Sequence, residues 1–235
     1  MKNKKIIFLA LIMQITFTAS FAQINITTIK VMDNGSVVYA ISVADVDSIY
    51  FTNQTVSNSI SGVAINGVVW ATRNVDAPGT FCTNPEDYGM LYQWNRPIGW
   101  SSSDPMTNSN GGTIWDSSMP TGDTWEESNN VCPTGWRIPT EAEITSLNNS
   151  GSVWTTVNGV NGRIYGSGET VVFFPAVADR YDNDGSLNYQ SSYRYYWSAT
   201  AIGVSGAYTL YFNSSSSYIT NGSRNYGFSV RCVAE

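Results

Sequence analysis

The chain contains no histidine, so any chemistry it performs rests on carboxylates, tyrosines, lysines and three cysteines. Histidine is the usual general base at neutral pH, the usual partner of a serine or cysteine nucleophile, and a common zinc ligand. Carboxylate pairs for glycoside hydrolysis remain, with Asp179 beside Asp182 or Glu169 as candidates. Glu141 and Glu143 lie two positions apart on a predicted helix and face different sides. We therefore predict no catalytic residue and favour a non-catalytic protein.

Large aromatic side chains in polar surroundings are stronger candidates for a site. Trp100 and Trp115 flank the polar segment 101–112, where an indole ring has little reason to lie unless it packs downward or binds a ligand. Aromatic rings stack on sugar faces, and tyrosine offers contact area at a small cost in side-chain entropy. Half or more of these rings could instead be core, as we expect of Trp70, Trp136 and Trp197. The predicted ligand-binding residues are Trp100, Trp115, Trp125, Tyr181, Tyr189 and Tyr193.

The acidic residues 179–185 match a calcium loop only in part. In an EF-hand loop glycine takes the sixth position, which would place the first ligand at Arg180, a residue that cannot coordinate calcium. A β-hairpin with a turn at Asp184-Gly185 is the better explanation. Residues 84–87 and 94–96 contain letters found in calcium-dependent sugar sites, but in the wrong order. We therefore predict no metal site and no cofactor.

The first 22 residues have the pattern of a secretory signal peptide. Three lysines precede a short apolar run that ends in Ser20-Phe21-Ala22, which indicates cleavage before Gln23. The run is too short to span a bilayer, so we expect no transmembrane segment. Loss of the three lysines would take the net charge from −6 to −6 − 3 = −9. We expect a secreted or outer-surface protein without a nucleic-acid partner, because phosphate contacts need clustered basic residues.

The rest of the chain divides into a small module, a linker and a main domain. Residues 23–51 predict a β-hairpin module, with strands on either side of a turn at 33–35 and a helical turn and short strand over 43–51. The polar residues 52–61 predict a linker. The main domain, 62–235, has Asn-Gly or Asp-Gly pairs that predict hairpin turns at 66–67, 158–159, 161–162, 184–185 and 221–222.

Two helix starts complete the main domain. Thr140 and Glu143 form a capping-box pattern that carries Ile144 and Leu147 inward, and residues 123–126 predict a second start. With no alternation of strands and helices, two short helices and irregular, loop-rich antiparallel sheets define an α+β fold.

Five segments of residues 62–235 together resemble one family. In chain order they are GVVWATRNV (67–75), PEDYGMLYQW (85–94), CPTGWRIPT (132–140), YWSAT (196–200) and GFSVRCV (227–233). They are similar to the Fibrobacter succinogenes major paralogous domain, found in exported bacterial proteins. The resemblance implies a C-type-lectin-like fold related to the formylglycine-generating enzymes, whose RLPTEAE run is similar to RIPTEAE at 137–143. Residues 24–51 resemble a module that precedes such domains in exported Bacteroidetes proteins.

The resemblance also sets expectations for strands and cysteines. Cys132 and Cys232 both lie in family motifs, which favours a disulfide between them; Cys82 with Cys132 is the alternative. A lectin-like fold would place Trp70 beside the strand 228–233, with Val68 and Trp70 facing a common core with Phe228, Val230 and Cys232. The formylglycine-generating enzymes hold copper with a pair of cysteines near the C-terminus, where this chain has Cys232 alone, so their oxidase activity does not carry over.

The favoured function is an exported, non-catalytic binding module that recognises a glycan or a surface protein. One alternative is a structural or tip subunit of a surface appendage, attached through residues 24–51. The other is a glycan-acting enzyme that uses carboxylates. The sequence carries no indication of oligomeric state.

Overall fold

The computed structural model describes residues 28–33, 36–42, 62–176, 178–188 and 194–235. The chain divides into two compact units, Met1–Ser57 and Asn58–Glu235. This boundary falls within the predicted linker 52–61. The predicted signal peptide, the linker and the elements predicted over 43–51 lie outside the described residues. Within the described ranges, no helix has the length and apolar character needed to cross a membrane.

The described part of the first unit is a β-hairpin. Strands β1 (Thr28–Asp33) and β2 (Ser36–Ser42) pair in antiparallel fashion. Their register shifts between Val31 and Met32, which marks a bulge. The predicted strand–turn–strand pattern is therefore confirmed for the two strands.

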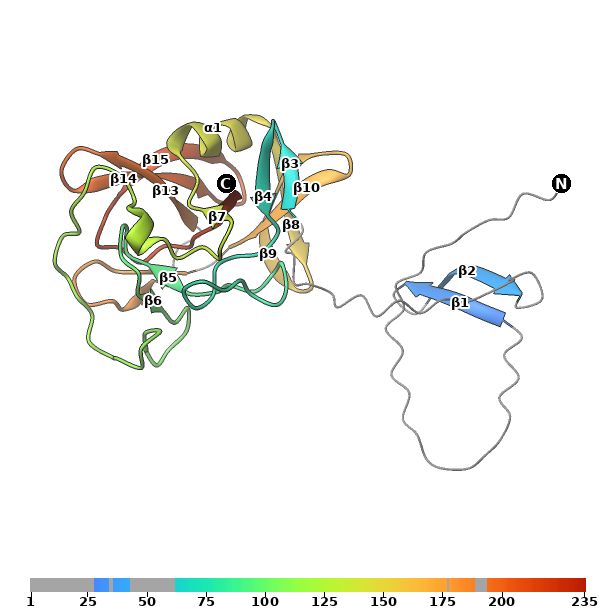
Figure 1. Cartoon of the computed structure of the whole chain (residues 1–235), viewed down its shortest axis with the longest axis horizontal. Coiled ribbons are helices and arrows are strands. Elements are labelled where there is room, and N and C mark those ends of the chain that lie inside the picture. The colour runs from blue at the N-terminus through green and yellow to red at the C-terminus, as the bar shows by residue number, and fades with distance from the viewer. Residues whose placement is uncertain (1–27, 34–35, 43–61, 177, 189–193) are drawn as a thin grey trace, which may run out of the picture. The chain divides into compact units, whose positions relative to one another are not determined.

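The second unit is mostly β, with several small antiparallel sheets (Figure 1). Its four-stranded sheet has the order β3 (Gly62–Ile65), β4 (Val68–Ala71), β16 (Val233–Ala234), β7 (Trp136–Arg137). Two three-stranded sheets consist of β10 (Thr170–Pro175), β9 (Val160–Ser167) and β8 (Ser152–Val157), and of β13 (Arg194–Ile202), β14 (Gly206–Phe212) and β15 (Ser217–Ser223). Two short pairs join β5 (Leu91–Tyr92) to β6 (Gly99–Trp100) and β11 (Asp179–Arg180) to β12 (Leu187–Asn188).

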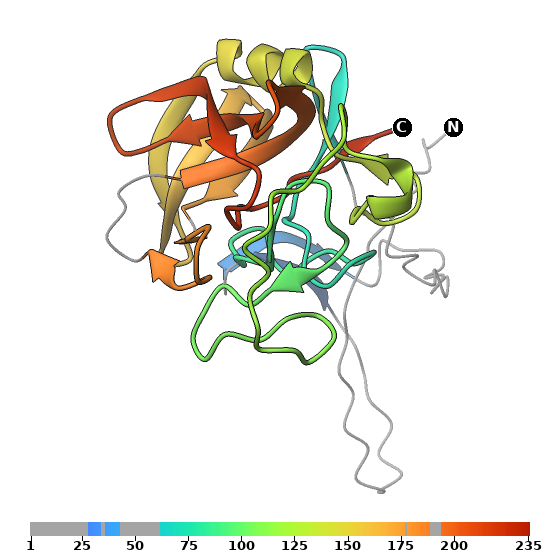
Figure 2. The same cartoon turned by 90° about the vertical axis from the view of Figure 1, so that its left-hand side faces the viewer.

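The described residues contain one α-helix, α1 (Glu141–Asn149), which packs on β13, β14 and β15 and lies across the top of the unit in Figure 2. The predicted capping box is present: the Thr140 side chain accepts from the Glu143 N–H, and the Glu143 carboxylate accepts from the Thr140 N–H at 2.7 Å. Such a cap contributes about 1 kcal/mol. Arg137 donates to both oxygens of Glu143, at 2.9 and 2.7 Å.

The prediction of a second helix starting at 123–126 is wrong. The chain is extended there, because Thr124 bridges Thr200 and the Trp125 N–H donates to the Ala199 carbonyl at 3.0 Å. Only a 3-10 turn, Glu127–Asn129, follows. Strand-like pairing with β13 satisfies the backbone groups that a helix would have used.

The final segment of the chain runs between two hydrophobic clusters. Val233 pairs with Trp70, and the Ala71 N–H donates to the Cys232 carbonyl at 2.9 Å, which confirms that the two ends of the main domain lie side by side. Phe228, Val230 and Cys232 belong to the first cluster, which includes Trp94 and Trp197.

The opposite face of this segment meets the second cluster. Val233 and Trp70 pack there with Phe174, and the Arg231 guanidinium lies 4.6 Å above the Phe174 ring. The predicted common core of Trp70 with Phe228 and Val230 is therefore wrong. Side chains alternate across a strand, so a strand buried on both faces contributes side chains to two clusters.

The cysteines follow the pairing that the resemblance implies. Cys132 and Cys232 form a disulfide with Cα atoms 6.1 Å apart. Cys82 is free and buried. Burial, followed by the charge of Asp76, raises the pKa of the Cys82 thiol to about 12, so the group stays protonated and unreactive at neutral pH.

Candidate ligand-binding site

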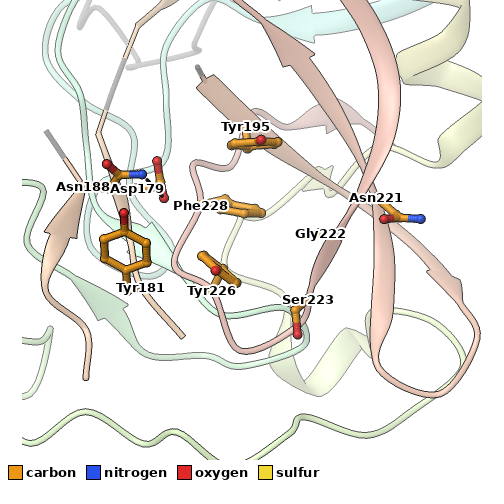
Figure 3. Close-up of a pocket in the computed structure, with 9 residues that line it drawn as sticks. All are labelled: Asp179, Tyr181, Asn188, Tyr195, Asn221, Gly222, Ser223, Tyr226 and Phe228. Carbon is orange, nitrogen blue, oxygen red and sulfur yellow. Dashed lines mark hydrogen bonds between the residues drawn. The ribbon is translucent and has the colours of Figure 1, made fainter. Parts of the chain in front are cut away.

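A pocket of about 290 Å³ opens where β11, β12, β13 and the end of β15 meet the segment that follows β15 (Figure 3). Pockets for small ligands span about 300–1,000 Å³, so this one has room for a single ring or side chain. It is lined by Asp179, Tyr181, Asn188, Tyr195, Asn221, Gly222, Ser223, Tyr226 and Phe228.

Four aromatic side chains form much of the wall. Tyr195 stacks on Phe228 with ring centroids 4.7 Å apart and planes 17° apart, and Tyr226 lies 5.5 Å from Phe228 at 32°. Figure 3 views Tyr195 and Phe228 nearly edge-on and Tyr181 closer to face-on. The ring centroids of Tyr181 and Tyr226 lie 6.2 Å apart with their planes at 57°, and Tyr181 is 39% exposed. Tyr181 therefore offers an open ring face, while the stack offers ring edges and phenol hydroxyls.

The backbone around the stack explains its position. Phe228 and Tyr92 exchange backbone hydrogen bonds of 2.8 and 3.0 Å, which anchor the segment that carries Tyr226. A Cβ atom at Gly222 would lie 2.5 Å from the Phe228 ring. A glycine is therefore required for β15 to lie against this ring. The predicted turn at 221–222 is wrong for this reason, since both residues belong to β15.

Polar groups face the same space. Asp179 is 4% exposed, and the Asn188 amide donates to its carboxylate at 3.4 Å. Arg180 and Gly227 exchange two backbone hydrogen bonds of 3.0 Å, so β11 is fixed to the segment between Tyr226 and Phe228. Asp179 is thereby held beside the aromatic stack.

Acidic side chains act on Tyr226, which lines the pocket. Burial raises the pKa of the Tyr226 phenol, and the charges of Asp182 and Asp179 raise it further. Burial lowers the pKa of Arg194, and the charge of Asp179 opposes that shift. The Asp179 charge therefore acts on both Tyr226 and Arg194.

The three predicted tryptophans lie in the core instead of forming an open platform. Trp100, Trp115 and Trp125 are 3%, 9% and 7% exposed. The ring centroids of Trp100 and Trp115 lie 4.9 Å apart, and the Trp125 indole N–H donates to the Asn129 carbonyl at 2.8 Å. This matches the core alternative for these rings.

Trp115 nevertheless supports the pocket from behind. Its indole N–H donates to the Asp182 carbonyl at 3.0 Å. A Cβ atom at Gly185 would lie 2.7 Å from the same ring, so the turn after Tyr181 rests directly on it. Of the predicted residues, Tyr181 lines the pocket, while Tyr189 and Tyr193 lie outside the described residues.

The acidic run 179–185 forms the predicted hairpin. Asp179 pairs with Asn188 across β11 and β12, and the Asp184 carboxylate accepts from the Ser186 N–H and hydroxyl at 2.9 and 2.7 Å. Arg180 is fully buried and donates to the carbonyls of Ser101 and Ser103. Within the described part of the chain, no group of three Cys, Asp or Glu side chains is placed to hold a metal ion.

A second pocket, of about 280 Å³, lies near Asn95. The Asn95 side chain accepts from the Glu126 N–H at 2.8 Å and from the Asn129 amide at 3.1 Å, and it donates to the Thr121 carbonyl at 2.9 Å. These bonds use its polar atoms to hold the surrounding loop. The first pocket is therefore the better candidate site.

Comparison with known proteins places the candidate site inside one family region. Residues 149–233 match a family described as "Domain of unknown function (DUF8237)". All nine lining residues fall within this stretch. No curated protein and no solved structure matches the chain.

Proposed function

We propose that this chain is an exported, non-catalytic binding module that takes one sugar ring of a glycan in the pocket of Asp179, Tyr181, Tyr195 and Tyr226. The observation that carries the proposal is the combination of an open tyrosine face with hydroxyl, amide and carboxylate groups around a space of about 290 Å³. Sugars present a C–H face that packs on aromatic rings and a rim of hydroxyls that hydrogen-bond to polar groups.

The disulfide supports export, since disulfides persist in oxidising compartments. A C-type-lectin-like fold of the major paralogous type belongs to the same proposal. The pairing of Val233 with Trp70, which joins the two ends of the main domain, supports it.

Glycoside hydrolysis is the second candidate, and one observation favours it. Asp179 and Asp182 both lie close enough to Tyr226 to raise the pKa of its phenol. A hydrolase would use two such carboxylates, about 5–10 Å apart, on either side of the scissile bond. Release of reducing ends from a bound glycan would establish this function, and unchanged glycan after prolonged incubation would favour binding alone.

The test is a glycan array probed with the mature chain and with Tyr181→Ala. Loss of the open ring face is expected to weaken binding at least about tenfold, equal to roughly 1.4 kcal/mol, with little change in melting temperature. Tyr218→Ala is the matched control, because Tyr218 is 47% exposed on β15 and does not line the pocket. Equal binding by wild type and Tyr181→Ala, or loss of binding in Tyr218→Ala, would contradict the proposal.

A further inference from the structure

The two outer edges of the β13–β14–β15 sheet differ. The outer edge of β13 is covered, because the Trp197 N–H donates to the Ser229 carbonyl at 3.0 Å. Thr200, further along β13, bridges Thr124. In the described part of the chain, no strand or bridge pairs with the outer edge of β15. Strand β15 is therefore the edge of this sheet that another strand can join.

Two hydrogen bonds that flank the β14–β15 pairing fix its pattern. Beyond one end, the Asn213 N–H donates to the Ser216 carbonyl at 2.9 Å. Beyond the other end, the Arg224 N–H donates to the Ser205 carbonyl at 2.9 Å. In an antiparallel pair, hydrogen-bonded positions alternate with positions whose backbone groups point to the other side. Both flanking bonds lead to the same alternation along the register of the two strands.

This alternation assigns a direction to the backbone groups of β15. The groups that point toward β14 belong to Tyr218, Thr220 and Gly222. The groups that point away from β14 belong to Ser217, Ile219 and Asn221. The outer edge of β15 therefore presents N–H and carbonyl groups at every second residue.

The outward groups of Ile219 and Asn221 have no hydrogen-bond partner among the described residues. The Ser223 carbonyl, by contrast, accepts from the Tyr226 N–H at 3.1 Å, so the open stretch ends there. The Asn221 residue is exposed, and Figure 3 shows its side chain pointing away from the aromatic stack. Each of the two residues thus offers one donor and one acceptor on this edge.

The edge also lacks the side chains that keep exposed strands apart. Charged residues and proline commonly prevent one edge strand from pairing with another. No Asp, Glu, Lys or Arg lies between Arg194 and Arg224, so β14 and β15 carry no charge. Strand β15 contains no proline either. Nothing in its sequence opposes the addition of a strand.

A second copy of the chain fits this edge. The chain has a formal net charge of −6, so two copies repel each other through much of their surface. Contact at an uncharged strand places no like charges opposite each other. A two-fold axis brings the same strand of both copies together in antiparallel fashion, so the outward N–H groups of each copy meet carbonyls of the other.

We propose that β15 pairs in antiparallel fashion with β15 of a second copy, so that the protein forms a dimer in which the two sheets are continuous. Asn221, Gly222 and Ser223 also line the pocket, so each dimer carries two pockets. The pairing uses backbone groups alone and needs no glycan. It therefore stands or falls independently of the proposed function.

The first test compares Asn221→Pro with Asn221→Ser by sedimentation velocity on the mature chain. Proline removes the outward N–H and is tolerated where that group faces away from the neighbouring strand. Asn221→Ser is the matched control, because it removes the same side chain and keeps the N–H. We expect wild type and Asn221→Ser to dimerise alike. Asn221→Pro is expected to raise the dissociation constant at least about tenfold, because each copy loses one donor.

The second test follows amide hydrogen exchange of the wild-type chain by NMR at low and high protein concentration. The Ile219 and Asn221 amides are expected to exchange slowly only at concentrations where the dimer forms. The Tyr218 and Thr220 amides are the internal control, because they bond to β14 and are expected to be slow at both concentrations. This measurement decides the question even if Asn221→Pro fails to fold.

Three results would overturn the proposal. The first is a wild-type chain that stays monomeric up to about 100 μM, where a dimer of micromolar dissociation constant is largely formed. The second is a dimer that a folded Asn221→Pro forms as tightly as Asn221→Ser, or whose formation leaves exchange at Ile219 and Asn221 unchanged, since another surface then holds it. The third is protection of both amides in the monomer, which would show that the chain itself covers the edge.

Discussion

The disulfide allows the sharpest prediction about stability. Replacing both Cys132 and Cys232 with alanine removes a crosslink that spans a sequence separation of 100 residues. Closing a loop of that length in the unfolded chain costs entropy worth about 4.7 kcal/mol at 25 °C. Both cysteines are also buried, so the lost sulfur atoms add a small packing cost. We expect the free energy of unfolding to fall by about 4–5 kcal/mol, a large share of the roughly 5–15 kcal/mol typical of a domain.

The assay is urea unfolding followed by tryptophan fluorescence on the mature chain under non-reducing conditions. The variant is also expected to show a larger m-value, because an uncrosslinked chain exposes more surface on unfolding. Cys82→Ala is the matched control: it removes a buried sulfur without opening a loop, and we expect it to cost less than about 2 kcal/mol. A double variant that loses no more stability than Cys82→Ala would refute the argument from loop closure.

Two further predictions concern Trp115 and the Arg137–Glu143 ion pair. Trp115→Ala is expected to lower the free energy of unfolding by about 3–5 kcal/mol because the ring is buried, and an unchanged urea midpoint would show that the ring is not part of the core. Hydrogen bonding to Arg137 is the largest of the effects that lower the pKa of Glu143, so its stabilising contribution is complete above the ordinary glutamate pKa and is lost as pH falls through the lowered one. Arg137 is 40% exposed, so we expect Arg137→Met to cost only about 0.5–1 kcal/mol at pH 7 and less in acid; a cost that grows on acidification would reverse the sign we assign.

Local patterns in the sequence predicted local structure well. The turn at Asn66-Gly67 has φ values of 50° and 82°, and the turn at Asn158-Gly159 has 48° and 83°. These positive values are the reason that the Asn-Gly pair favours a two-residue hairpin. The capping box at Thr140 is equally local, since all its hydrogen bonds lie within four residues.

The same Asn-Gly pattern failed where tertiary packing required the glycine. Asn161-Gly162 lies inside β9, where a Cβ atom at Gly162 would lie 2.3 Å from the Phe174 carbonyl oxygen and 2.5 Å from the Phe173 ring. Gly222 is in β15 for the same kind of reason, against Phe228. Such a glycine allows the backbone or a side chain of another segment to approach closely, which the neighbouring residues in sequence do not reveal.

The pocket combines residues that the sequence keeps far apart. Tyr195 follows residues outside the described part of the chain, and Tyr226 and Phe228 lie about 30 positions further on. Tyr195 and Phe228 also sit beside or within motif segments, where an aromatic residue is most simply interpreted as core. The tyrosine-rich second half of the chain contains the candidate pocket, while the pairing of β11 with Gly227 decides which of those rings meet.

The buried tryptophans connect the fold to the site. Trp100 contacts Trp115, Trp115 holds the Asp182 carbonyl, and Gly185 rests on the Trp115 ring. Arg180 ties the same turn to Ser101, across a sequence separation of 79 residues. Trp115 thus fixes the position of the turn that follows Tyr181. The tryptophans in the polar segment therefore position Tyr181 in the pocket wall from within the core.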